Sequence, residues 1–230
     1  MIKNIFLDLD DTILDFRRGE RIALCRTFEL KKIKYDEDVI KRYVEINLDC
    51  WRALERGEMT RDEVLVGRFN RLFCELGIKE SAVEVQKIYE NSLAQEREFL
   101  PGGKELLDSL GKCGKYRLFM ATNGIPEVQK PRIKNSGVGE YFDGIFISDE
   151  IGFSKPDRRF FEKCFDLIPN FKKEETIIVG DSLSSDIQGG INAGILTCHF
   201  NPKASSYSNI KPDYTINELS ELIPLLDGIK

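Results

Sequence analysis

Seven polar side chains with the chemistry of phosphate or metal sites occur in loops that follow short apolar segments. They are Asp8, Asp10, Thr122, Asn123, Lys155, Asp181 and Asp186. If the apolar segments are neighbouring parallel strands, their carboxyl ends meet at one edge of a sheet, where open α/β sheets bind ligands. The order of these residues along the chain therefore predicts one shared site of carboxylates, a hydroxyl and an ammonium group.

The residue types indicate what this site does. Asp8 and Asp10 are two residues apart, so in an extended chain they project to the same side, where two negative charges repel unless a cation lies between them. Oxygen ligands without histidine or cysteine favour Mg²⁺. A carboxylate can also act as a covalent nucleophile toward a phosphoryl group, and Lys155 and Thr122 would then stabilise the phosphoryl oxygens.

Each of these motifs has an ordinary explanation when it is taken alone. An Asp-x-Asp sequence can be an acidic turn, Thr-Asn-Gly can be a plain turn, and Asp181 can cap a helix. A lysine such as Lys155 is most often solvent-exposed. The conjunction of all four motifs at successive strand ends is what indicates a common site.

The elements that position these residues alternate between strands and helices. The predicted strands cover residues 2–9, 116–121, 145–147, 176–179, 195–200 and 214–216, and the helices cover residues 105–110, 127–135, 158–167, 186–193 and 218–226. This alternation is typical of an α/β fold with a parallel sheet and helices on both faces.

The segment from residue 16 to residue 98 has a different pattern. Its apolar residues recur every three to four positions, which predicts about four amphipathic helices, and Thr60 with Glu63 predicts a capping box at the start of one of them. The simplest organisation is an α/β catalytic core formed by residues 1–15 and 99–230, with residues 16–98 inserted as a helical domain.

Composition excludes several classes of protein. The 34 Lys and Arg residues are outnumbered by 39 Asp and Glu residues, which argues against a nucleic-acid polymer as partner. No apolar stretch approaches the ~20 residues of a membrane helix, and acidic residues occur where a signal peptide would be apolar, so we expect no membrane association and a cytoplasmic location. The single histidine, His199, is expected to be an ordinary strand-end residue.

The four motifs resemble those of the haloacid dehalogenase superfamily, whose phosphatases use an aspartate nucleophile. The resemblance implies a Rossmann-like parallel sheet core with an inserted α-helical cap of the type-one class. It also implies that Asp8 attacks phosphorus and forms an aspartyl-phosphate. Asp10 would protonate the leaving alkoxide and then act as a base on the hydrolytic water. Thr122 would hydrogen-bond the phosphoryl oxygens, and Lys155 would neutralise them together with Asp8.

The resemblance further implies a Mg²⁺ site. Its expected ligands are Asp8, the backbone carbonyl of Asp10, and Asp181, with Asp186 as an outer-shell or water-mediated partner. The presence of an acid at position 10 favours a phosphate ester, because a dehalogenase needs no general acid for its halide. A carbon–phosphorus hydrolase would need a cap lysine, but Lys31, Lys32 and Lys34 are expected to lie on a solvated face.

The substrate is suggested by a looser resemblance to bacterial pyrimidine 5′-nucleotidases in residues 51–60, 67–69, 147–156 and 189–194. It implies a small phosphate ester, a nucleoside 5′-monophosphate with pyrimidine preferred, acted on by a monomer or homodimer. The alternatives are phosphoglycolate, a sugar phosphate, a sugar-phosphate mutase, a phospho-accepting switch protein or a non-catalytic binding module. Expected substrate contacts are Asn123, Phe16, Arg17 and Trp51, although Trp51 is also a candidate core residue.

Overall fold

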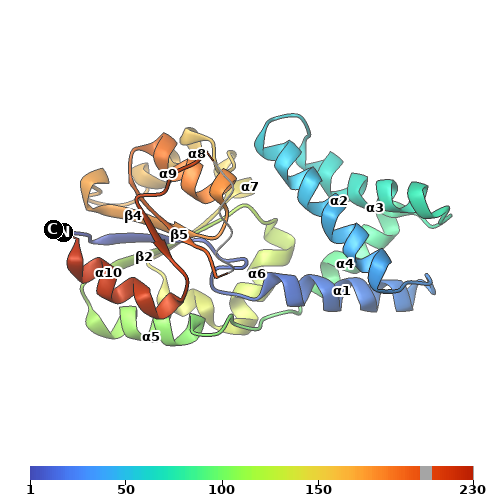
Figure 1. Ribbon diagram of the computed structural model, residues 1–230, viewed down its shortest axis with the longest axis horizontal. Helices are drawn as coiled ribbons and strands as arrows, with labels where there is room; N and C mark the ends of the chain where they lie inside the picture. The colour runs from blue at the N-terminus through green and yellow to red at the C-terminus, as the bar shows by residue number, and fades with distance from the viewer. Residues whose placement is uncertain (203–208, 230) are drawn as a thin grey trace. The chain divides into compact units, whose positions relative to one another are not determined.

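The computed structural model describes residues 1–202 and 209–229 and divides into two compact units. One unit, the α/β unit, consists of residues 1–16 together with residues from 97 onward, and the other, the helical unit, consists of residues 17–96. Figure 1 shows both units along the chain. Among the described residues, no helix has the length and apolar character needed to cross a membrane.

The α/β unit is built on a parallel sheet whose strand order is β3-β2-β1-β4-β5-β6. The strands are β1 (Asn4–Leu7), β2 (Arg117–Thr122), β3 (Gly144–Ile147), β4 (Thr176–Gly180), β5 (Leu196–Phe200) and β6 (Tyr214–Ile216). All six lie where the sequence predicts them, so the predicted fold class is confirmed. From β1 the chain first adds β2 and β3 on one side and then adds β4, β5 and β6 on the other side. Ligands of open α/β sheets bind where the strand order reverses in this way, so the carboxyl end of β1 is the expected place for a ligand.

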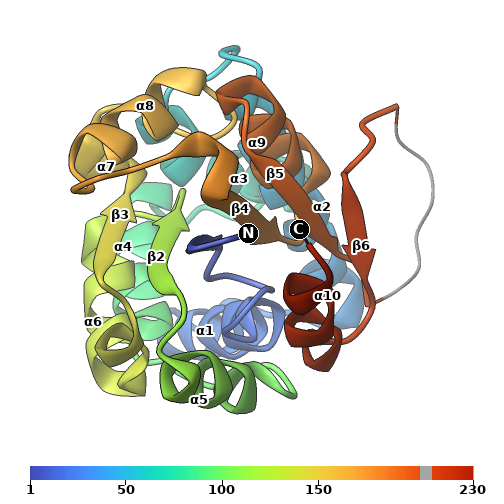
Figure 2. The same cartoon turned by 90° about the vertical axis from the view of Figure 1, so that its left-hand side faces the viewer.

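Helices cover both faces of this sheet (Figure 2). They are α5 (Gly103–Cys113), α6 (Pro126–Ser136), α7 (Ser148–Ile151), α8 (Arg158–Asp166), α9 (Gln188–Ala193) and α10 (Leu222–Gly228). Leu7 of β1 belongs to an apolar cluster with residues of α5 and α10, whereas Phe6 belongs to a second cluster with residues of α8. Successive side chains of a strand point to opposite faces, so a strand covered on both faces is apolar throughout.

Within the described part of the α/β unit there are also four short helical segments. Three are 3₁₀ turns, at Val138–Tyr141, Lys173–Glu175 and Leu219–Glu221, and one is a π-helical turn at Leu183–Ile187. The sequence predicts a helix over residues 186–193, but the observed helical path begins earlier, with the π turn leading into α9. The Ser182 hydroxyl caps this turn by accepting a hydrogen bond from the Ser185 N–H at 3.2 Å. Asp186 lies within this π turn.

The helical unit contains the four predicted amphipathic helices. They are α1 (Phe16–Leu30), whose first residue belongs to the α/β unit, α2 (Glu37–Glu55), α3 (Arg61–Leu76) and α4 (Ala82–Leu93). The predicted capping box is confirmed, because Thr60 and Glu63 exchange hydrogen bonds at the start of α3. The interior of the helical unit contains the buried Arg68, which donates hydrogen bonds to Asn47 Oδ1 at 2.8 Å and Gln86 Oε1 at 3.0 Å.

Candidate active site

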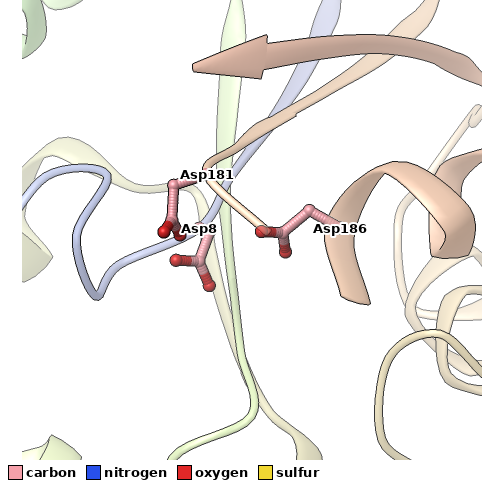
Figure 3. A group of neighbouring side chains, drawn as sticks. All are labelled: Asp8, Asp181 and Asp186. Atoms are coloured by element: carbon pink, nitrogen blue, oxygen red, sulfur yellow. The ribbon is translucent and has the colours of Figure 1, made fainter. Parts of the chain in front are cut away.

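An acidic cluster lies at the carboxyl ends of β1 and β4, two neighbouring strands. It consists of Asp8, Asp181 and Asp186, each of which offers a carboxylate oxygen within 4.8 Å of the others. Figure 3 shows the three side chains converging from the end of β1, the end of β4 and the π turn. Three oxygen donors without nitrogen or sulfur match the preference of Mg²⁺, so the cluster fits the predicted metal.

The close approach of Asp186 depends on a glycine at the end of β4. A Cβ atom at Gly180 would lie 2.3 Å from the Asp186 carboxylate, which is too close for any side chain. Asp186 is 1% exposed, and its Oδ2 accepts a hydrogen bond from the Ser182 N–H at 3.1 Å. Gly180 therefore makes room for a buried carboxylate that the backbone also holds.

Lys155 is the cation of the site and is 1% exposed. Its Nζ donates to Asp8 Oδ1 at 2.7 Å, to Asp186 Oδ1 at 2.6 Å and to the Ala121 carbonyl at 2.5 Å, which uses all three ammonium protons. Burial alone would lower the pKa of Lys155, but the carboxylates of Asp186 and Asp8 outweigh it, and the net pKa is raised. The lysine therefore stays charged between two acids.

Asp8 is the acid whose proton affinity the site changes most clearly. Burial raises the pKa of Asp8 to about 7, while the attraction of Lys155 opposes this increase and the nearby Asp186 and Asp10 add to it. Without a divalent cation, Asp8 thus takes up a proton near neutral pH. A bound cation would favour the ionised carboxylate that a nucleophile needs.

This raised pKa predicts how the stability of the metal-free protein depends on pH. A carboxyl whose pKa is about 7 in the folded protein, against 3.8 in the reference state, contributes stability that is complete below pH 3.8 and is lost as pH rises through 7. Asn mimics the neutral acid and does not titrate. In EDTA, the melting temperature of Asp8→Asn should therefore rise relative to that of wild type as pH increases from 3.8 to 7. A constant difference across the range would contradict the raised pKa.

Thr12 links two members of the acidic cluster. Its buried hydroxyl donates to Asp8 Oδ2 at 3.3 Å and accepts from the Asp181 N–H at 3.2 Å. His199 lies on β5, where its Nε2 is 3.0 Å from the Asp181 carbonyl oxygen. Burial lowers the pKa of His199. Its contact with the Asp181 backbone helps to hold the loop that carries Asp181.

Asp10 does not join the acidic cluster with its side chain. Its carboxylate accepts hydrogen bonds from Arg132 Nη1 at 2.5 Å and from Gln129 Nε2 at 2.7 Å, and Gln129 Nε2 also lies 2.8 Å from Thr122 Oγ1. Asp10 and Thr122 thus share one partner. Gln129 and Arg132 were not among the predicted site residues. They could have been recognised as two polar residues that lie three positions apart on the buried face of the helix that follows Thr122.

Asn123 is brought to the site, but its amide contacts the Lys155 backbone. Asn123 Nδ2 donates to the Lys155 carbonyl at 2.8 Å, and Oδ1 accepts from the Lys155 N–H at 2.9 Å. Nδ2 is also 3.2 Å from the Ser185 hydroxyl. These contacts fix the loop that presents the lysine, and a substrate contact by Asn123 stays a prediction.

The other expected substrate contacts lie in different surroundings. Phe16 is half-buried, with the Arg132 guanidinium 5.7 Å from its ring centre. Arg17 is exposed at the start of the helical unit, and Trp51 is half-buried on α2 with Arg61 6.0 Å from its ring. Trp51 is therefore not a fully buried core residue.

Comparison with known proteins connects this geometry to a family. A sequence model of haloacid dehalogenase-like hydrolases matches residues 2–194. The chain is 38% identical to the HAD-hydrolase YfnB of Bacillus subtilis over 226 residues, which cover 98% of this chain and 95% of YfnB. The crystal structure of YfnB bound to magnesium matches with a TM-score of 0.93 at 37% identity, over 98% of this chain and 99% of that one.

Two further relatives have names that state an activity. The pyrimidine 5′-nucleotidase PynA of Streptococcus pneumoniae is 37% identical over 226 residues, covering 98% of this chain and 95% of PynA. The pyrimidine 5′-nucleotidase YjjG of Escherichia coli is 30% identical over 223 residues, covering 96% of each chain. These matches extend over both compact units.

Proposed function

The chain belongs to the haloacid dehalogenase-like hydrolase family, as its motifs predicted, and we propose that it is a Mg²⁺-dependent phosphomonoesterase acting on nucleoside 5′-monophosphates, with pyrimidines preferred. One observation carries the phosphatase chemistry: the edge of the sheet holds two acids in different surroundings. Asp8 lies against Lys155 in the acidic cluster, whereas Asp10 lies against Gln129 and Arg132. A nucleophile and a general acid need such distinct environments.

In the proposed reaction, a carboxylate oxygen of Asp8 attacks phosphorus as the bond from phosphorus to the ester oxygen breaks. Asp10 gives its proton to the departing alkoxide, which leaves an aspartyl-phosphate on Asp8. Asp10 then takes a proton from a water molecule whose oxygen attacks phosphorus. The bond to the Asp8 oxygen breaks, and inorganic phosphate leaves.

Thr122 and Lys155 stabilise the charge of the phosphoryl group in this proposal. The Thr122 oxygen already accepts hydrogen bonds from Gln129 Nε2 at 2.8 Å and from the Gly124 N–H at 3.2 Å, so its own hydroxyl proton is the group that donates to phosphoryl oxygen. Lys155 is held beside Asp8 before substrate arrives. Charges that are already oriented are more effective than charges that must reorganise during the reaction.

The proposed metal ligands are Asp8, Asp181 and the backbone carbonyl of Asp10. Asp186, whose oxygens accept hydrogen bonds from Lys155 Nζ and from the Ser182 N–H, is proposed to contact the metal through a water molecule. Magnesium bound here would supply positive charge toward the phosphoryl oxygens. The magnesium-bound structure of the similar YfnB supports this choice of metal.

The substrate class is supported by the two relatives named pyrimidine 5′-nucleotidases. We propose that the helical unit, inserted in the chain after the Asp8–Thr12 loop, is the cap that selects the leaving group. Another small phosphate ester is the alternative. A Schiff-base mechanism is disfavoured at Lys31, whose ammonium pairs with Glu80 at 2.8 Å and Glu84 at 3.0 Å.

A panel of phosphate esters tests this proposal. We expect pyrimidine 5′-monophosphates to have higher kcat/KM than purine nucleotides, phosphoglycolate or sugar phosphates, because kcat/KM measures discrimination among substrates. Chelation with EDTA should abolish hydrolysis, and added Mg²⁺ should restore it. Preference for a sugar phosphate would favour the alternative substrate class, whereas hydrolysis that survives complete chelation would contradict the metal-dependent mechanism.

A further inference from the structure

We infer that Gln129 and Arg132 of α6 are positioning residues that place the Asp10 carboxylate beside Thr122, and that they are required for protonation of the leaving group. This inference rests on the proposed function, in which Asp10 is the general acid. Both residues lie outside the four motifs. Their role in positioning Asp10 matters only for leaving groups that need a proton.

Gln129 connects the acid to the phosphate-binding hydroxyl. Its Nε2 donates to Asp10 Oδ2 at 2.7 Å and to Thr122 Oγ1 at 2.8 Å, so a single amide group sets the spacing between the two. The Gln129 side chain is 1% exposed and loses its freedom to rotate. The Asp10 carboxylate and the phosphoryl-binding hydroxyl are therefore kept next to each other.

Arg132 fixes both Gln129 and Asp10. Its Nη1 donates to Gln129 Oε1 at 2.8 Å, which orients the amide so that its NH₂ group faces Asp10 and Thr122. The same Nη1 donates to Asp10 Oδ1 at 2.5 Å. Arg132 is 1% exposed, whereas the Asp10 side chain is 24% exposed. The arginine thus lies behind the acid, and Asp10 alone reaches the solvent side.

Two neighbouring residues shape this network. A Cβ atom at Gly124 would lie 2.3 Å from Gln129 Nε2, so glycine at this position lets the amide pass over the backbone. The Arg132 guanidinium lies 5.7 Å from the centre of the Phe16 ring, within the range of a cation–π contact. Phe16, predicted as a substrate contact, accordingly also helps to fix the position of Arg132.

The chemical consequence concerns only the step in which the leaving group departs. An alkoxide leaves poorly without a proton, whereas p-nitrophenolate leaves well without one, so a misplaced Asp10 should matter for the first and little for the second. A residue that merely stabilises the fold would affect both esters equally. The dependence on the leaving group therefore separates positioning from a general structural role.

The test compares kcat/KM for a nucleoside 5′-monophosphate and for p-nitrophenyl phosphate in Arg132→Met, Arg132→Lys and Gly124→Ala. We expect Arg132→Met to lose about 10²-fold on the nucleotide, the typical cost of a misplacement of roughly 1 Å, and far less on the aryl ester. Arg132→Lys should retain part of the activity. Gly124→Ala, which displaces Gln129 without touching an acid, should lose activity on both esters because Thr122 also loses its partner.

The matched control is Arg117→Met. Arg117 donates to Asn4 Oδ1 at 2.7 Å and to the Pro169 carbonyl at 2.8 Å, at the opposite end of β2, so its removal should leave the ratio of the two kcat/KM values unchanged. In an Asp10→Asn background, Arg132→Met should cause no further loss, because both substitutions remove the same function. Equal losses on both esters in Arg132→Met, or additive losses when Arg132→Met is combined with Asp10→Asn, would overturn the inference.

A crystal structure of Arg132→Met gives a readout that does not depend on turnover. We expect the Asp10 carboxylate to leave its position beside Thr122, and an unchanged Asp10 would overturn the inference even if activity fell. If wild type hydrolysed no phosphate ester while Asp10 moved in the variant, the proposed function would fail and the positioning of Asp10 would stand. The two proposals can therefore fail separately.

Discussion

Asp8→Asn should lower kcat by at least about 10⁴-fold while the protein stays folded, because an amide cannot act as the nucleophile that forms the covalent intermediate. The substitution keeps the size and shape of the side chain of a residue that is 7% exposed, and Lys155 retains Asp186 as its counter-ion. The measurement is single-turnover hydrolysis of a nucleoside 5′-monophosphate with Mg²⁺ present, together with a thermal melt of the variant.

The control for Asp8→Asn is Asp166→Asn, which removes an exposed carboxylate at the end of α8 in the same unit. This variant should match wild type in both kcat and melting temperature. A loss of activity in Asp8→Asn that merely followed a loss of folded protein would not support a chemical role. Turnover of Asp8→Asn within tenfold of wild type would exclude Asp8 as the nucleophile.

Lys155→Met should combine a loss of activity with a loss of stability. The activity should fall at least ~10²-fold, because an oriented charge beside the phosphoryl group disappears. The free energy of unfolding near neutral pH should fall by about 3–5 kcal/mol, the usual cost of leaving a buried ionic partner unpaired, since Asp8 and Asp186 then face each other without a cation between them.

Two measurements and one control variant separate these two effects of Lys155→Met. Urea unfolding gives the free energy, steady-state kinetics gives the activity, and Lys163→Met, at an exposed position on α8, should change neither. The stability defect should shrink as pH falls toward 7 and then level off, because Lys155 lowers the pKa of Asp8 and its removal lets Asp8 become neutral at a higher pH than in wild type, where that pKa is about 7. An unfolding free energy equal to that of wild type at pH 8 would contradict the observed buried cluster.

Local sequence patterns were sufficient to predict the sheet and the ends of its strands. A run such as β1 is short and apolar throughout, which distinguishes a strand covered on both faces from an amphipathic helix. The acids after β1 and β4 follow directly from that assignment, since parallel strands bring their carboxyl ends together. Asp8, Thr122 and Asp181 could therefore be placed at one edge without any knowledge of tertiary contacts.

Contacts made by long side chains could not be predicted in this way. Gln129 and Arg132 reach Asp10 across more than a hundred residues of sequence, and no local pattern specifies such a reach. The burial of Asp186 depends on the absence of a side chain at Gly180 and on an unpredicted π turn. Arg68 similarly lies in the interior of the helical unit because distant amides and aromatic rings surround it.

Trapping the phosphoryl group on the enzyme tests the central claim most directly. Wild-type protein is mixed with a radiolabelled nucleoside 5′-monophosphate and Mg²⁺, quenched in acid within one turnover, and digested for peptide mapping. The mechanism predicts label on the peptide that contains Asp8, and none in Asp8→Asn. Rapid release of phosphate with no labelled peptide, or with label on a different residue, would contradict covalent catalysis by Asp8.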